Sequence, residues 1–294
     1  MDLDAGQLRA LAAAVDAGSL DGAARRLHVT PSAVSQRIKA LEAATGRVLL
    51  VRAKPVRVTP SGAAVLRLAR QVELLAADTA RELHTDGAGA GPVTVPIAVN
   101  ADSLATWVLP ALAPLSEDHR FDLYRADQER TGDLLRDGTV MAAVTAESEP
   151  VPGCRVVPLG AMRYRPMATA AFVRRWFPEG VTAGALAVAP VVVFDREDDL
   201  QHAYLRRWGI TRPLVHHVPS SADYVRAVQL GMGWGTVPDL QLAQTADGPE
   251  LVELDPDGAT DVVLHWQQWR LHSPALDRVA EAVLAAARAQ LVRR

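Results

Sequence analysis

Apolar residues near the start of the chain recur at intervals of three and four positions, which is the spacing of helices with one buried face. The spacing predicts three short helices within residues 1–45. Their apolar positions are Leu8, Leu11, Ala12 and Val15 in the first, Leu20, Ala23, Ala24 and Leu27 in the second, and Val34, Ile38 and Leu41 in the third. Three such helices can share one core, so the pattern predicts a small helical domain.

The second and third helices are predicted to meet at the turn His28-Val29-Thr30. Thr30 suits the N-cap, and Pro31 suits the first helical position because its missing N–H leaves no hydrogen bond unmade. The outward face of the third helix carries no carboxylate before Glu42; it presents Ser32, Ser35, Gln36, Arg37 and Lys39. Such groups bond base edges and phosphates, which favours a helix-turn-helix over the alternative, a helical hairpin with a solvated polar face.

The segment VLLVRAKPVRV, which follows the third helix, is rich in β-formers on both sides of Ala53-Lys54-Pro55 and predicts a small hairpin. Taken alone, a loose basic loop is about as good an interpretation. Its place directly after the third helix favours a wing over the phosphates. The predicted DNA contacts of helices and wing together are Arg25, Thr30, Ser32, Ser35, Gln36, Arg37, Lys39, Arg52, Lys54 and Arg57.

A long amphipathic helix is predicted to begin at Thr59-Pro60 and to end near His84. Its apolar face contains Val65, Leu68, Val72, Leu75 and Thr79. A helix of this length extends about 37 Å. A domain this small cannot bury the whole stripe, so we expect the helix to pair with its copy in a homodimer. The Gly- and Pro-rich residues 86–92 are predicted to form a hinge.

From Val93 onward, short apolar strands alternate with helices, which predicts βαβ units, a mostly parallel sheet and two α/β lobes. The predicted strands are VTVPIAV, FDLYRA, VMAAVTA, APVVVFD, PLVHHVP and WGTVP. The expected domains are a winged helix-turn-helix over 1–58, a linker helix over 59–85, the hinge over 86–92, lobe I over 93–165 and 266–294, and lobe II over 166–265.

The charge of the chain is divided unevenly along its 294 residues. Residues 1–85 carry 12 Lys and Arg against 8 Asp and Glu, which is +4, so the overall charge of −3 leaves −7 for the remainder. A basic segment joined to an acidic body predicts a nucleic-acid contact at the N-terminal end.

The sequence shows neither a secretory signal nor an apolar run of the length that a membrane span requires, so we expect a cytoplasmic protein with no membrane contact. The single cysteine, Cys154, excludes an internal disulfide and is expected to be a packed thiol. No metal or cofactor is expected.

Carboxylates and amides follow several predicted strands, where open α/β folds bind their ligands. The candidates are Asn100, Asp102 and Ser103 after VPIAV, Asp127, Gln128 and Glu129 after FDLYRA, Thr145 and Glu147 after VMAAV, and Asp195 and Asp198 after APVVVF. Carboxylates suit a cationic ligand side chain, and helix N–H groups near Asn100 suit a carboxylate. Solvated loops or helix caps are the alternative for each acid; capping explains Asp102 and Asp199 well.

Other classes of protein find less support in the sequence. An enzyme lacks candidate residues, because neither HExxH nor GxSxG occurs and the glycine-rich run 231–235 follows a helix instead of preceding one. That run and Trp107, Trp234 and Trp266 are interpreted as packing residues. A solute-binding protein would need export and no DNA domain. A nucleoid-coating protein would bind DNA without sequence preference.

The run AGSLDGAARRLHVTPSAVSQRIKALE and the later LLVRAKPVRVTPSG resemble the winged helix-turn-helix and linker helix of LysR-type transcriptional regulators. The segments NADSLATW, LGAMRYR, DREDDLQH and GMGWGTVP resemble the ArgP/LysG branch, which regulates basic amino-acid export. The resemblance covers nearly the whole chain. It implies an all-α DNA-binding domain, a dimerising linker helix and an α/β effector domain of two Rossmann-like lobes, similar to type II periplasmic binding proteins.

The resemblance also implies how such a protein works. The expected partners are an operator in double-stranded DNA, lysine or arginine as effector, and a second copy of the chain, with a tetramer of two dimers as a further possibility. Ser103 matches the serine with which the family contacts its effector. Closure of the lobes around the effector is expected to change how the dimers are placed relative to one another. This change would alter how the DNA is bent or how RNA polymerase is recruited. The alternatives are a regulator with a different effector, or a solute-binding protein without regulation.

Overall fold

The computed structural model describes residues 3–51, 53–83, 92–126, 128–244 and 249–293. The chain forms two compact units: unit 1 is Met1–Val99, Pro114–Val157 and Trp266–Glu281, and unit 2 is Asn100–Ala113, Pro158–His265 and Ala282–Arg294. The domain boundaries expected from the sequence stay a prediction, and most of the hinge, 86–91, lies outside the described residues. Within the described part of the chain, no helix is long and apolar enough to cross a membrane.

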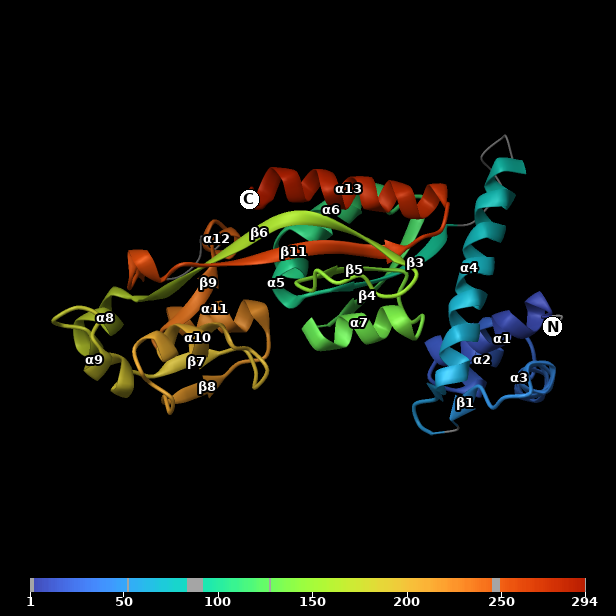
Figure 1. The fold of residues 1–294 in the computed structure, drawn as a ribbon, viewed down its shortest axis with the longest axis horizontal. Coiled ribbons are helices and arrows are strands. Elements are labelled where there is room, and N and C mark those ends of the chain that lie inside the picture. The colour runs from blue at the N-terminus through green and yellow to red at the C-terminus, as the bar shows by residue number, and fades with distance from the viewer. Residues whose placement is uncertain (1–2, 52, 84–91, 127, 245–248, 294) are drawn as a thin grey trace. The chain divides into compact units, whose positions relative to one another are not determined.

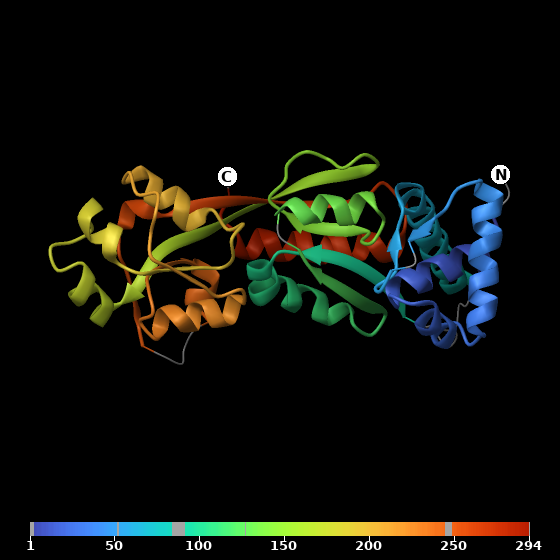
Figure 2. The same cartoon turned by 90° about the horizontal axis from the view of Figure 1, so that it is seen from below.

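Unit 1 begins with the three predicted helices, α1 (Ala5–Asp16), α2 (Leu20–Arg26) and α3 (Pro31–Thr45). Each is N-capped, because the side chains of Asp4, Ser19 and Thr30 accept hydrogen bonds from backbone N–H groups three residues later. Helix α1 packs against α2, α3 and the long helix α4 (Pro60–Leu83), and both views show the four helices as one group (Figure 1, Figure 2). The apolar positions predicted from the spacing form or border one core, so the helical domain is confirmed.

The predicted hairpin is present as β1 (Leu50–Val51) and β2 (Arg57–Val58), paired antiparallel. Helix α4 follows after Thr59, whose hydroxyl accepts a hydrogen bond from the Gly62 N–H at 3.0 Å and donates to the Val48 carbonyl at 2.7 Å. The backbone of Leu49 lies so close to Gly62 that a Cβ there would collide with the Leu49 carbonyl. The start of α4 is therefore fixed against the hairpin.

The apolar face of α4 differs from the predicted one. Leu66 and Ala69 are buried in the core of the helical domain, and Val65 and Val72 are partly buried against it. Leu68 and Leu75 instead expose 37% and 41% of their surface, and Thr79 is also exposed. The predicted stripe thus divides into one face that binds the helical domain and one that remains uncovered, because an extended apolar pattern wraps around a long helix.

Unit 1 also holds strands β3 (Val93–Val99), β4 (His119–Arg125) and β5 (Ala142–Thr145), with α7 (Gln128–Arg136). Strand β3 pairs in parallel with both β4 and β5, as predicted. The long strands β6 (Cys154–Thr169) and β11 (Thr260–Trp269) run through both units. The sheet has the order β10-β6-β11-β5-β3-β4 with β9 also paired to β6.

The prediction of a mostly parallel sheet is wrong for β6. This strand pairs antiparallel with β9 (Gly235–Pro238) and β10 (Leu251–Glu253). Its sequence, CRVVPLGAMRYRPMAT, interrupts the apolar residues with Pro, Gly and Arg, so no buried parallel strand could be recognised there. The sheet is therefore mixed, with parallel pairs at β3 and antiparallel pairs at β6.

Unit 2 contains the remaining predicted elements, which include α10 (Leu200–Arg207) and α11 (Ser221–Gln229) near the parallel pair β7 (Val191–Val193) and β8 (Val215–His217) (Figure 1). The predicted helix near Leu104 is composite. Its parts are α5 (Ala101–Ser103), a π-helical turn (Leu104–Val108), α6 (Leu109–Leu112) and a 3₁₀ turn (Ala113–Leu115). The helices α8 (Ala170–Trp176), α9 (Ala183–Val188) and α12 (Asp239–Leu242) and a 3₁₀ turn (Pro256–Gly258) complete the unit, and α13 (Pro274–Gln290) ends the helical part of the chain.

Several packing expectations are confirmed. Trp107, Trp234 and Trp266 are buried, and so is Cys154, whose pKa is raised by burial to about 11. In the glycine-rich run, Gly233 lies against the backbone of Pro190 and Gly235 against the ring of Tyr224, so side chains would not fit. These glycines serve close packing.

Candidate DNA-binding surface and effector site

The third helix turns its polar residues outward while its apolar residues enter the core. Val34, Ile38 and Leu41 are buried. Ser32, Gln36 and Lys39 are exposed, and Ser35 and Arg37 are partly exposed. The Thr30 hydroxyl accepts from the Ala33 N–H at 3.2 Å and shares a 2.9 Å hydrogen bond with the Ser32 hydroxyl. Thr30 therefore orders the start of the helix.

The hairpin extends the same basic surface. Lys54 and Arg57 are exposed, as is Arg25 at the end of α2, and Arg52 lies outside the described residues. The Val56 N–H donates to the Gly18 carbonyl at 3.0 Å, which attaches the hairpin to the loop before α2. An exposed basic hairpin beside a polar helix can contact phosphates on both sides of a groove.

A buried ion pair, which the sequence did not reveal, joins the helical domain to α4. Asp16, at the end of α1, accepts hydrogen bonds from Arg70 of α4 at 2.5 Å and from Arg26 of α2 at 2.8 Å. Arg70 is only 5% exposed. Removing one partner of such a pair would leave an uncompensated buried charge, so the contact fixes α1 and α2 on α4.

Asp102 is the half-buried centre of a polar cluster in unit 2. One carboxylate oxygen accepts from the Tyr164 hydroxyl at 2.8 Å, and the other accepts from the Ser221 hydroxyl at 2.6 Å. The helix is capped by Asn100 instead, whose side chain accepts a hydrogen bond from the Ser103 N–H at 2.9 Å. The interpretation of Asp102 as a helix cap is therefore wrong.

The neighbours of Asp102 come from separate elements of unit 2. Tyr164 lies on β6, Ser221 begins α11, and the Gln241 amide of α12 donates to the Ser221 hydroxyl at 2.5 Å. Burial raises the pKa of Asp102, although the hydrogen bonds from Ser221 and Tyr164 lower it in part. Burial also raises the pKa of Tyr164 well above its ordinary value, so its hydroxyl remains a donor.

A second acid, Asp198, lies near enough for its charge to act on the same cluster. Burial raises the pKa of Asp198, and the negative charge of Asp102 raises it further. Its carboxylate accepts from the Leu200 N–H at 3.0 Å and from the Phe194 N–H at 3.3 Å. The structure therefore holds two carboxylates in a poorly solvated region, where like charges destabilise each other.

Several buried polar atoms of unit 2 have no hydrogen-bond partner among the described residues. Two of them are the hydroxyl of Ser103 and the amide oxygen of Gln201. The Gln201 amide nitrogen is used, because it donates to the Tyr224 hydroxyl at 2.7 Å and to the Thr236 hydroxyl at 2.9 Å. An unpaired buried polar atom costs about 1–3 kcal/mol, so these two atoms are suited to a polar ligand.

The other predicted effector residues have different surroundings. Asp195 accepts from the N–H groups of Glu197 and Asp198, so it shapes the turn that carries Asp198. Thr145 and Glu147 belong to unit 1, and the Thr145 hydroxyl accepts from the Glu147 N–H at 3.1 Å. In the same unit Gln128 and Glu129 begin α7, while Asp127 lies outside the described residues. Asp199 is the N-cap residue of α10, but its side chain pairs with Arg206 and makes no capping hydrogen bond.

Sequence reasoning missed most of the uncharged members of the cluster: Tyr164, Gln201, Ser221, Tyr224 and Gln241. Tyr164 and Gln201 do occur in LGAMRYR and DREDDLQH, which carried the family resemblance. The described residues contain no group of three or more His, Cys, Asp or Glu side chains placed to hold a metal ion.

A winged helix-turn-helix with an outward polar and basic helix, joined to an α/β domain with a buried acidic site, defines a ligand-responsive DNA-binding protein. Residues 5–63 match the family model of the bacterial regulatory helix-turn-helix protein, lysR family, and residues 92–288 match that of the LysR substrate binding domain. The chain belongs to the LysR family of transcriptional regulators, within its LysG and ArgP branch.

The proteins that this chain resembles are transcriptional regulators, and the similarity covers nearly their whole length. The regulator LysG of Mycobacterium tuberculosis is 47% identical, over 97% of this chain and 94% of that protein. The crystal structure of ArgP from Mycobacterium tuberculosis has 46% identity and a TM-score of 0.84, with 99% of both chains covered. The full-length LysG of Corynebacterium glutamicum with bound effector Arg has 38% identity and a TM-score of 0.76, with 98% of this chain and 99% of that chain covered. The predicted fold class is confirmed.

Replacement of Lys39 by alanine is expected to weaken binding to all DNA sequences by a similar factor, because the lysine is predicted to neutralise a phosphate. The slope of log affinity against log salt should fall by about 1. Gln36→Ala should instead reduce discrimination against altered operators by about 1–3 kcal/mol. Titrations of operator fragments at several salt concentrations measure both.

The matched control is Arg174→Ala, which removes an exposed arginine of α8 outside the helical domain. It should leave affinity and salt slope unchanged. An unchanged affinity and slope for Lys39→Ala would show that the assignment of the recognition helix is wrong.

Proposed function

We propose that this regulator senses a basic amino acid, lysine or arginine, at the Asp102 cluster and thereby controls genes such as one for a basic amino-acid exporter. The observation that carries the proposal is the pair of half-buried carboxylates, Asp102 and Asp198, whose pKa values are both raised by desolvation. The LysG structure with bound arginine, from a 38% identical relative, supports the same class of effector.

The chemistry of the cluster suits a cation with hydrogen-bond donors. Tyr164 and Ser221 already donate to Asp102, but neither brings a positive charge. An ammonium or guanidinium group between Asp102 and Asp198 would reduce their mutual repulsion and form charge-assisted hydrogen bonds. A neutral side chain of similar size would leave both carboxylates without a counter-charge. Selection for a basic amino acid follows from this difference.

The remaining polar groups suit the other end of an amino acid. The buried hydroxyl of Ser103 has no partner among the described residues and can donate to a ligand carboxylate. The family resemblance assigns an effector contact to the same serine. Asn100 supports it by capping the turn that carries Ser103. Asp195, in the same unit, remains a proposed member of the site by its place after β7. The effector contacts expected from the sequence for Asp127, Gln128, Glu129, Thr145 and Glu147 stay predictions.

The exposed face of α4 supports a homodimer. Leu68, Leu75 and Thr79 recur at intervals of seven and four, the spacing of a helix that pairs with another helix. Two helical domains in one dimer would present two recognition helices to an operator of approximate two-fold symmetry. Assembly into tetramers and recruitment of RNA polymerase belong to the same proposal. A regulator of chromosomal genes acts in the cytoplasm, where the DNA is.

Asp102→Asn is expected to weaken arginine and lysine binding about 10- to 100-fold, because a hydrogen bond to a charged group contributes about 1.5–3 kcal/mol. Calorimetry with the full-length protein, with leucine as the neutral ligand, measures the effect. Asp199→Asn is the matched control, since Asp199 is exposed and paired with Arg206. Equal affinity for leucine and arginine in the unmodified protein would contradict the acidic site.

Arginine affinity is expected to fall with decreasing pH, starting at a higher pH than the titration of an ordinary aspartate. A carboxyl with a raised pKa binds a cation only when it is ionised, so affinity is present above the raised pKa and lost as the pH falls through it. The ligand guanidinium stays protonated throughout. Calorimetry in two buffers of different ionisation enthalpy should detect protons released on binding. A pH-independent affinity down to the ordinary aspartate range would oppose this assignment.

The double substitution Leu68→Glu and Leu75→Glu is expected to convert the dimer into monomers, because it places like charges on an apolar interface. Light scattering after size-exclusion chromatography measures the mass. Val188→Glu is the control, since Val188 is 58% exposed on α9 and lies outside the linker helix. A dimer that persists after the double substitution would rule out α4 as the main contact.

A further inference from the structure

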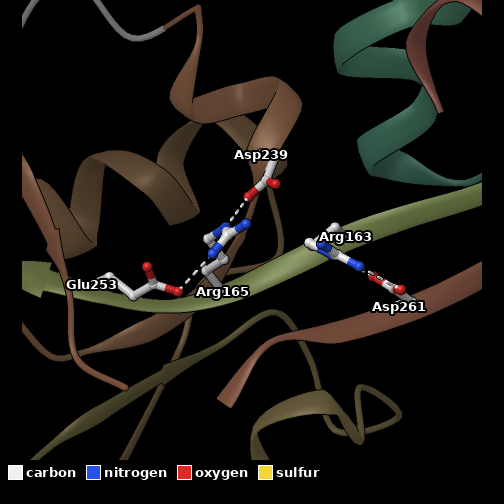
Figure 3. Close-up of polar contacts among 5 residues, drawn as sticks. All are labelled: Arg163, Arg165, Asp239, Glu253 and Asp261. Atoms are coloured by element: carbon white, nitrogen blue, oxygen red, sulfur yellow. Dashed lines mark hydrogen bonds and ion pairs between the residues drawn. The ribbon is translucent and has the colours of Figure 1, made fainter. Parts of the chain in front are cut away.

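Strand β6 presents different residues on its two faces around the effector site. Tyr164 points to Asp102, with its hydroxyl 2.8 Å from the carboxylate. Its neighbours Arg163 and Arg165 lie on the opposite face, because side chains alternate along a strand. Figure 3 shows both arginines in ion pairs. The two arginines make chemically similar ion pairs, but the acids that they contact lie on different elements of unit 2.

Arg165 joins two acids that come from separate elements. Its Nε donates to Asp239 at 2.8 Å and its Nη1 donates to Glu253 of β10 at 2.8 Å (Figure 3). Asp239 is the first residue of α12, a helix of four residues. A helix this short is not stable by itself, so its position depends on the contacts that its ends make. The Arg165 fork supplies one of them.

Helix α12 carries Gln241, and this residue leads back to Asp102. The Gln241 amide donates to the Ser221 hydroxyl, and Ser221 donates to Asp102 at 2.6 Å. A serine hydroxyl has a single proton. When Gln241 donates to its oxygen, that proton is free to point to Asp102, and the approach of the amide excludes the reverse orientation. Gln241 therefore sets the direction of the hydrogen bond that Asp102 receives.

We propose that Arg165 is a positioning residue for effector recognition: it holds Asp239 and Glu253, fixes α12, and so keeps Gln241 and Ser221 directed at Asp102. The inference rests on the proposed role of Asp102 in binding a basic amino acid. Arg165 itself touches none of the proposed ligand contacts. It acts through α12, whose next turn is also tied down by the Gln244 amide donating to the Thr106 carbonyl at 3.3 Å.

Arg163 provides a matched control on the same strand. Its Nε and Nη2 donate to the two carboxylate oxygens of Asp261 on β11, at 2.7 and 2.9 Å. Its side chain is 36% exposed, against 30% for Arg165. Partly exposed ion pairs contribute little to stability, so neither substitution should unfold the protein. Of the two arginines, Arg165 is the one that forms an ion pair with α12, so its loss should weaken effector binding more than the loss of Arg163.

The experiment is calorimetric titration of the full-length protein with arginine. Arg165→Gln is expected to weaken binding about five- to tenfold, less than the loss of a whole hydrogen bond to a charged group, because Ser221 stays in place and is only misdirected. Arg163→Gln should bind as the unmodified protein does. The arginine affinity of Arg165→Lys should lie between that of Arg165→Gln and that of the unmodified protein, because a single ammonium cannot hold both acids as the guanidinium fork does. Thermal unfolding of each variant confirms that it is folded.

A double-mutant cycle tests the route through α12. Gln241→Met removes the amide while keeping most of the volume. If Arg165 acts through Gln241, the variant with both Arg165→Gln and Gln241→Met should bind arginine no more weakly than Gln241→Met alone. Additive losses, equal losses for Arg163→Gln and Arg165→Gln, or no loss for Arg165→Gln would overturn the positioning role.

The two levels of the proposal fail in distinguishable ways. If the unmodified protein binds neither arginine nor lysine, the effector assignment is wrong and the role of Arg165 falls with it. If the unmodified protein binds arginine and Arg165→Gln binds it equally well, only the positioning role is wrong.

Discussion

The proposed effector site depends on two half-buried carboxylates, Asp102 and Asp198, whose pKa values are raised by desolvation. Asp102 receives its hydrogen bonds from the hydroxyls of Tyr164 and Ser221, which satisfy its oxygens but do not neutralise its charge. The nearby charge of Asp198 makes ionisation of both acids less favourable. A site in this condition binds a cation more strongly than a surface carboxylate does, because there is less water to replace. In the proposed site, the preference for a cationic ligand therefore follows from the low solvation of the two carboxylates.

The sequence predicts the helical domain well because its signals are local. Caps at Ser19 and Thr30, a proline at the first helical position and apolar residues at helical spacing all indicate the same helices. The wing was harder to predict, because strands of two residues show little alternation. Its position directly after the third helix favoured a wing over a loose loop. The long strand β6 was missed, because its sequence mixes arginine, glycine and proline with apolar residues.

The sequence predicted the charged members of the candidate site, together with the neutral Asn100 and Ser103, but missed most of the other neutral members. A carboxylate at a predicted strand end is visible in a sequence, and Asp102 and Asp198 were found in this way. The partners of Asp102 are separated from it by 62 residues for Tyr164 and 119 for Ser221, and no local pattern records such a contact. The same limit explains why capping stayed an alternative for Asp102. Distinguishing a cap from a buried acceptor requires the tertiary structure.

The linker helix is held by contacts at several levels of its length. Gly62 lies against Leu49, Arg70 pairs with Asp16, and Asp78 accepts from the Ser273 hydroxyl that caps the start of α13. The winged domain is thus attached to a rigid rod. Two such rods joined along their length would set the rotational phase at which two half-sites of a duplex can be read together. If half a turn of DNA is inserted between the half-sites, a single dimer can then no longer bind both half-sites at once.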